Sequence, residues 1–106
     1  MPKYLVSVNY TGDGAKGLRK DGGTKRRHVA AKAIESVGGK IEAFYFCLGA
    51  HDAIVIADFP DAISAVGLSV AIAASGSVRL ETTPLLTAED MDRACEKKTA
   101  YKAPGA

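Results

Sequence analysis

The chain lacks the residues that would mark a disulfide-rich or metal-binding protein. It has only two cysteines among 106 residues, and Cys47 and Cys95 share no CxxC spacing. Thiolate metal sites and redox motifs depend on such spacings, so both cysteines are interpreted as reduced core residues in a reducing compartment. The two histidines, His28 and His51, have no ligand-like spacing either. We therefore expect no metal site and no cofactor.

The chain also lacks a long apolar segment and a strong net charge. The charge-free stretch 62–76 is too short and too rich in Gly and Ser to cross about 30 Å of bilayer. The N-terminus enters a predicted strand directly, without the basic and apolar regions of a signal peptide. A net charge of +2 says little about partners. These absences predict a cytoplasmic protein with no membrane partner.

No repeat, linker or low-complexity segment divides the chain. Its hydrophobic fraction of 47% and charged fraction of 25% are those of an ordinary globular domain. We predict a single domain over residues 1–98 and a C-terminal tail over residues 99–106 that has no periodicity. The tail is either frayed or an arm laid on a neighbouring molecule, with Tyr101 as its anchor.

Residues 40–59 are typical of a β-hairpin with a tight turn at residues 49–52. Gly supplies positive φ in such a turn, and both flanks are rich in aromatic and β-branched residues. Strict alternation would place Ile41, Ala43 and Tyr45 opposite Phe44 and Phe46, so that both faces are apolar. A sheet with one wet face would alternate apolar and polar residues. We expect the chain's own helices to cover one face and a second subunit to cover the other.

The remaining periodicities predict two further strands and three helices. They are a strand over 3–10 with Tyr4, Val6, Val8 and Tyr10 toward the helices, a helix over 24–37, an uncharged helix over 62–74, a strand over 77–86 and a short helix over 87–98 with Met91, Ala94 and Cys95 inward. A helix that is apolar all round should be buried all round, which we expect for residues 62–74. The order is that of an α+β, ferredoxin-like βαββαβ fold: a four-stranded antiparallel sheet with helices on one face, plus a short C-terminal helix.

Residues 11–23 are rich in glycine and formally match a dinucleotide fingerprint at Gly12, Gly14 and Gly17. That motif needs an uninterrupted helix after the glycines and a parallel βαβ unit. Gly22 and Gly23 would break any such helix, and the second strand enters a hairpin. We therefore expect a mobile loop with a single helical turn over residues 15–20.

Half of the basic residues, seven of fourteen, lie between Lys16 and Lys32. Charge runs are usually solvated faces, and we favour that interpretation over an anion or nucleic-acid site. RNA-recognition domains of similar topology stack bases on aromatic residues of their central strands. The predicted third strand lacks that aromatic pattern and has only Phe59. We expect no specific binding of nucleic acid.

Several stretches together resemble the GYD-domain family. They are residues 8–11 closing the first strand, 38–40 leading into 43–45, 49–52 followed by 53–56, and 76–82. The resemblance implies a ferredoxin-like subunit that pairs as a dimeric α/β barrel, and it implies no established activity. The family's Gly-Tyr-Asp is replaced here by Gly49, Ala50, His51 and Asp52, so no role of that Tyr is carried over.

The candidate ligand-binding residues are Asn9, His51, Asp52 and Arg79, at the ends of predicted strands and in the hairpin turn. Asn offers a donor and an acceptor, Arg a fork for an anion, and His a group that titrates near neutrality. We also expect the Asp52 carboxylate to accept backbone N–H groups within its turn. Two hypotheses follow: a non-catalytic small-molecule-binding or oligomer-forming protein, or a cofactor-independent monooxygenase- or isomerase-like enzyme with His51 as the acid–base group. The expected partners are a second copy of the chain and a small molecule.

Overall fold

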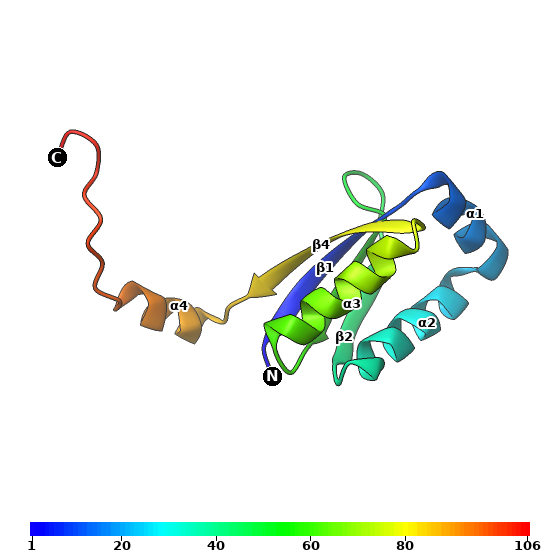
Figure 1. Cartoon of the computed structure of the whole chain (residues 1–106), viewed down its shortest axis with the longest axis horizontal. Coiled ribbons are helices and arrows are strands. Elements are labelled where there is room, and N and C mark those ends of the chain that lie inside the picture. The colour runs from blue at the N-terminus through cyan, green and yellow to red at the C-terminus, as the bar shows by residue number, and fades with distance from the viewer.

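The computed structural model covers residues 1–106 and has an α+β fold. Its elements are β1 (Lys3–Tyr10), α1 (Gly12–Asp21), α2 (Gly23–Ser36), β2 (Lys40–Phe46), β3 (Ala53–Asp58), α3 (Ala62–Ala74), β4 (Val78–Leu85) and α4 (Ala88–Cys95). The four strands form one antiparallel sheet in the order β2-β3-β1-β4. Helices α2 and α3 lie on the same face of this sheet (Figure 1). The predicted ferredoxin-like arrangement is confirmed.

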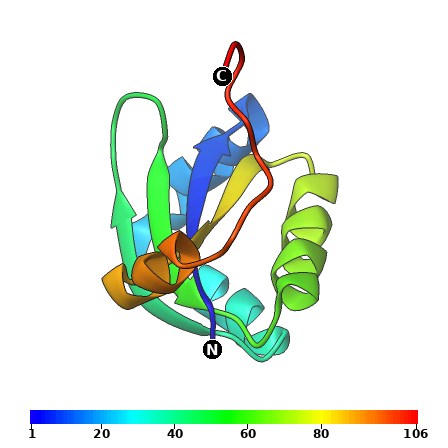
Figure 2. The same cartoon turned by 90° about the vertical axis from the view of Figure 1, so that its left-hand side faces the viewer.

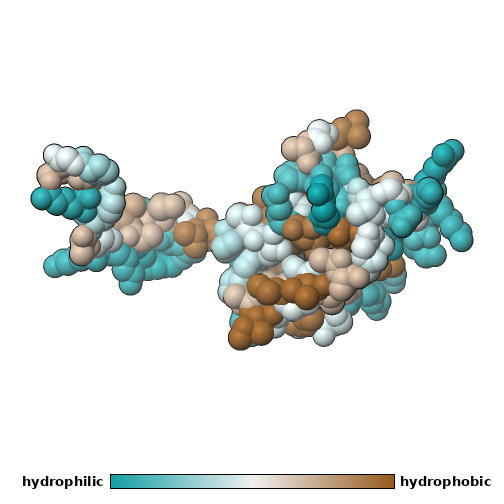
Figure 3. Space-filling model, turned by 45° about the horizontal axis from the view of Figure 1, so that its top comes forward, coloured by the Kyte–Doolittle hydropathy of each residue, from teal (hydrophilic) through white to brown (hydrophobic).

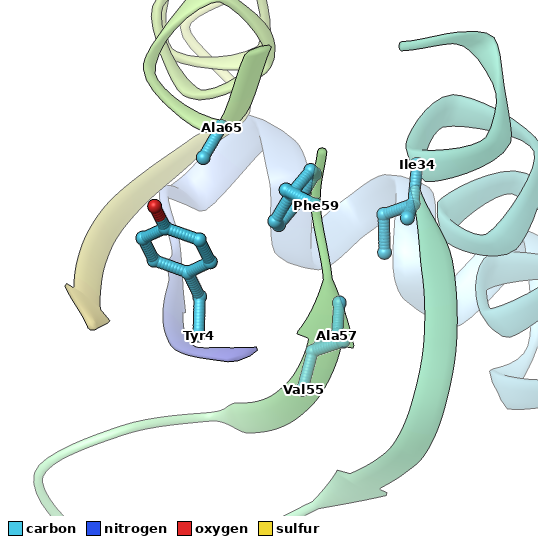
Figure 4. Packing of buried hydrophobic residues seen from close by; sticks show 6 residues of the cluster. All are labelled: Tyr4, Ile34, Val55, Ala57, Phe59 and Ala65. Atoms are coloured by element: carbon cyan, nitrogen blue, oxygen red, sulfur yellow. The ribbon is translucent and has the colours of Figure 1, made fainter. Parts of the chain in front are cut away.

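The core lies between the sheet and the two helices. It consists of side chains from β1, β3 and the residue after β3, α2 and α3 that point toward one another (Figure 4): Tyr4, Ile34, Val55, Ala57, Phe59 and Ala65. The rings of Tyr4 and Phe59 meet edge to face with centroids 5.5 Å apart. Val6 and Val8 pack against this cluster. The alternation predicted for the first strand is therefore confirmed.

The prediction that side chains alternate strictly between the two faces along β2 was wrong. Ile41 pairs with Ala57, whereas Ala43 pairs with Ile56, so Glu42 is an extra residue in a β-bulge. One extra residue reverses the alternation on one side of a bulge. As a result Ile41 and Phe44 both pack against the helix-side core, although the sequence pattern placed them on opposite faces.

The glycine-rich segment after β1 is a ten-residue helix, α1, and not the loop that the sequence predicted. The Thr11 hydroxyl caps it by accepting a hydrogen bond from the Gly14 amide at 3.2 Å and donates to the Gly76 carbonyl at 2.9 Å. The Thr11 amide donates to the Ser77 carbonyl at 3.0 Å. Gly22, with φ of +83°, ends α1 before α2 begins. Anchoring to the start of β4 thus stabilises a segment of poor helix propensity.

Helix α3 begins and ends where the sequence predicted, because Asp61 caps it by accepting from the Ser64 amide at 2.7 Å. The prediction that it is buried all round was wrong for the single chain. Only Ala65 is fully buried, while Ile63, Val66 and Val70 are 85%, 56% and 62% exposed. Figure 3 shows hydrophobic side chains gathered on the part of the surface where α3 lies. One side of α3 packs on the sheet, and its other side is an apolar surface.

Helix α4 and the tail project from the end of β4 away from the sheet (Figures 1 and 2). A capping box formed by Thr87 and Asp90 begins α4. The prediction that Met91, Ala94 and Cys95 point inward was wrong, since none of α4 is buried and Met91 is 53% exposed. Tyr101 is exposed as well. No helix of the chain is long and apolar enough to span a bilayer.

Candidate functional site

Three of the four candidate residues meet at one end of the sheet. Asn9, near the end of β1, is the register partner of Arg79 on β4. The Asn9 side-chain amide donates to the Ala50 carbonyl at 2.9 Å, and its oxygen lies 2.9 Å from Nδ1 of His51. The amide of Asn9 therefore connects strand β1 to the β2–β3 loop and orients the His51 ring.

The fourth candidate, Asp52, connects the same loop to β1. Its carboxylate accepts a hydrogen bond from the Tyr10 amide at 2.8 Å, and its own amide donates to the Val8 carbonyl at 2.8 Å. The expected role of accepting a backbone N–H group is present, but the donor belongs to the neighbouring strand and not to the turn. The reason is that β1 runs two residues beyond its pairing with β3, which leaves the Tyr10 amide to the loop.

This polar cluster of Asn9, His51 and Arg79 belongs to the face of the sheet opposite the helices. Val8 packs on the helix side and side chains alternate along a strand, so Asn9 points to the open side. Arg79 is exposed and His51 half-buried. The cluster contains donors, an acceptor and a titratable ring, and its use as a ligand site stays a prediction.

Replacing Asp52 with Ala is expected to lower the free energy of unfolding by about 1 kcal/mol, because the Tyr10 amide loses a cap-like acceptor. Asp52→Asn keeps an acceptor oxygen and should lose less. Urea denaturation of the three proteins checks this. An Asp52→Ala protein with unchanged stability and a lost ligand would show that the carboxylate contacts ligand instead.

An apolar cavity of about 140 Å³, which the sequence pattern does not reveal, lies between the sheet and the helices. Helix α2 packs on β2 and α3 packs on β4, at the two edges of the sheet, so the space over β1 and β3 is only partly filled. Fourteen of the sixteen lining residues are hydrophobic. The lining residues are Val6, Val8, Tyr10, Arg26, Val29, Ala30, Ala33, Ile34, Phe44, Val55, Phe59, Leu68, Ser69, Ile72, Val78 and Leu80.

Few polar groups line this cavity. The Ser69 hydroxyl donates to the Ala65 carbonyl at 2.9 Å and lies 2.9 Å from the Thr82 hydroxyl, so it is already satisfied. The guanidinium of Arg26 lies 3.7 Å from the Asp21 carboxylate and is about two-thirds buried. Burial raises the pKa of the Tyr10 phenol, and the charge of Arg26 offsets part of that rise. Tyr10 is therefore a protonated donor at neutral pH, beside a permanent cation.

Only the folded chain shows that Arg26 lines the cavity. In the sequence it is one cation of a basic run that also includes Lys25 and Arg27, both of which are exposed. The sequence feature that could have identified Arg26 is its helical spacing, because Arg26, Val29, Ala30 and Ala33 share one side of α2. The small Ala side chains on that side leave room between the helix and the sheet.

No His, Cys, Asp and Glu side chains gather in a group of three or more that could hold a metal ion. No curated protein and no solved structure matches the chain. The model of the GYD domain matches residues 4–95, which include the sheet apart from Lys3, all four helices and the residues Asn9, His51, Asp52 and Arg79. The chain therefore belongs to the GYD domain family.

Proposed function

We propose that the protein is a non-catalytic binding protein for a small, largely apolar molecule. The observation that supports this is the cavity between the sheet and helices α2 and α3, with fourteen hydrophobic residues among its sixteen. Ligand sites are usually concave and mostly apolar, with few polar groups that orient the ligand. An apolar protein cavity of about 150 Å³ holds benzene, so the volume here suits a molecule with one ring.

The second candidate function is a cofactor-independent enzyme of the monooxygenase or isomerase type with His51 as the acid–base group. The hydrogen bond between Asn9 and Nδ1 of His51 favours it, because a general base is commonly oriented by a third group. However, Asn9 and His51 lie on the open side of the sheet, whereas the apolar cavity lies on the helix side. A reaction at His51 would need a substrate on the open face, so binding without catalysis is the better-supported function.

Titration with toluene, followed by amide chemical shifts, tests the binding function. We expect shifts confined to residues that line the cavity. Ala33→Leu should weaken toluene binding by about tenfold or more, because the added carbons occupy the cavity. Ala71→Leu makes the same change on the exposed side of α3 and should have no effect. Absence of saturable shifts in the unmodified protein would contradict the proposal.

We also propose that two copies of the chain pair through the open face of the sheet. That face carries an apolar patch in two register rows, which we call the open-face patch: Leu5, Ala43, Tyr45, Ile54 and Ile56. Neither α2 nor α3 covers it (Figures 1 and 2). A contiguous apolar patch of this kind is typical of a protein–protein interface. The tail and α4 offer a second contact, with Met91 and Tyr101 exposed.

Light scattering at micromolar concentration is expected to show a dimer, with twice the chain mass of 11.0 kDa. Ile56→Lys should yield a monomer, because it places a charge in the centre of the open-face patch. Ile63→Lys is the matched control on the exposed side of α3 and should leave the dimer intact. A stable monomer of the unmodified chain would contradict the proposal. Dissociation of the dimer by Ile63→Lys, without dissociation by Ile56→Lys, would also contradict it.

A further inference from the structure

We infer that the ligand of the sheet–helix cavity is a monocyclic or short branched molecule with one carboxylate, which Arg26 and the Tyr10 phenol bind. The inference rests on the proposed function, since it names the ligand class of the same cavity. Arg26 is the only charged residue that lines the cavity, and Tyr10 lines it as well. An anionic group would therefore meet both residues while the rest of the ligand contacts hydrocarbon.

The acid that contacts Arg26 is shared with a second cation. The Asp21 carboxylate lies 3.7 Å from Nη1 of Arg26 and 3.5 Å from Nζ of Lys25, so one acid faces two cations. A guanidinium has five N–H donors in a planar fork, so the contacts of Arg26 with Asp21 and with the Tyr10 phenol leave other donors for a further acceptor. The partial burial of Arg26 reduces solvent screening, which strengthens its attraction for an anion.

The Tyr10 phenol adds one O–H donor to the N–H donors of the Arg26 guanidinium. This phenol is half-buried and protonated at neutral pH, so it can donate only one hydrogen bond, to an acceptor. A carboxylate has two oxygens and suits a guanidinium together with one O–H donor, in charge-assisted bonds that are stronger than neutral ones. The backbone of Tyr10 is itself held by Asp52, so this donor is anchored at the end of β1.

The other lining residues restrict the ligand to a single charge. Ser69, at the α3 side of the cavity, has a hydroxyl that is already bonded to Ala65 and Thr82. A second ionised group on the ligand would therefore lie among hydrophobic side chains without a partner, which is strongly unfavourable. A cationic group would be repelled by Arg26. The volume of about 140 Å³ limits the apolar part to about one ring.

Calorimetric titration with benzoate, toluene and benzylamine tests the inference on the full chain. We expect benzoate to bind about tenfold or more tightly than toluene, as a charge-assisted pair would give, and benzylamine to bind most weakly. Arg26→Gln should remove the preference for benzoate and leave toluene binding unchanged. Arg27→Gln removes the same charge from the next residue, which is exposed and does not line the cavity, and should change neither affinity. Tyr10→Phe should weaken benzoate binding severalfold and toluene binding not at all.

The outcomes separate the inference from the function on which it rests. Equal binding of toluene and benzoate would overturn the carboxylate inference and leave the apolar cavity site standing. An equal loss of benzoate binding in the Arg27→Gln and Arg26→Gln proteins would also overturn it, because the attraction would then be general to the basic surface. Failure of all three probes to bind would overturn the proposed function. Retained toluene binding by Arg26→Gln shows that this variant is folded.

Discussion

Phe59→Ala is expected to lower the free energy of unfolding by about 3–5 kcal/mol, which is the usual cost of removing a buried aromatic ring. Phe59 is 1% exposed and is the largest fully buried side chain. Its ring contacts Tyr4 edge to face and belongs to the core that joins β3 to both helices. It also lines the cavity, so its removal enlarges an existing void that the neighbouring side chains do not fill. A domain of this size has only about 5–15 kcal/mol in total, so the variant should lose a large share of its stability.

Urea denaturation measures this effect as a shift in midpoint at constant slope. Leu48→Ala is the control, because it removes a large hydrophobic side chain from a fully exposed position in the β2–β3 loop, outside the open-face patch. That variant should lose less than about 1 kcal/mol, as surface substitutions usually do. A loss for Phe59→Ala no larger than that for Leu48→Ala would show that the ring is not the centre of the core.

Gly14→Ala is expected to destabilise the protein by about 3 kcal/mol, at the upper end for overpacking, because the contact is with backbone. Gly14 is the one buried residue of α1. A Cβ atom at this position would overlap the carbonyl oxygen of Ser77, which is backbone at the start of β4. Relief requires α1 to move away from β4, and the hydrogen bonds from Thr11 to Gly76 and Ser77 would then be lost.

Gly17→Ala is the matched control in the same helix. No atom lies within 4 Å of the Cβ that it would add, so it gains only the better helix propensity of Ala. It should stabilise the protein by roughly 0.5–1 kcal/mol. Thermal unfolding of both variants gives shifts of opposite sign. A Gly14→Ala protein as stable as Gly17→Ala would mean that α1 does not approach β4 as closely as described.

The faces of strand β1 could be predicted because alternation needs only the local pleat. Tyr4, Val6 and Val8 on β1 face the helices as their spacing indicated. The bounds of α3 could also be predicted, because they depend on neighbouring residues: Asp61 caps the first turn and Gly76 follows the last. The bulge at Glu42 could not be predicted, because an extra residue is defined only by the strand that it pairs with.

Helix α1 shows why local preference failed in the glycine-rich segment. Three glycines in ten residues disfavour a helix, and the hydrogen bonds that stabilise it come from Gly76 and Ser77, more than sixty residues away. Helix α4 shows the opposite error. Its amphipathic spacing was correct and its capping box formed, but the pattern does not say which surface, or which molecule, covers Met91.

The sequence by itself determined the order of the four strands and of helices α2, α3 and α4, and it determined the membership of the GYD domain family, because each depends on short-range periodicity or on matched residues. It also indicated that Asn9, His51, Asp52 and Arg79 lie at strand ends and in a loop. Only the tertiary structure decided that β1 and the β2–β3 loop bring Asn9 and His51 into contact. It alone placed Arg26 and Tyr10 at an apolar cavity. The physical reason is that a cavity is the space left when α2 and α3 pack on opposite edges of the sheet, and a residue's own periodicity carries no information about the distance between two helices.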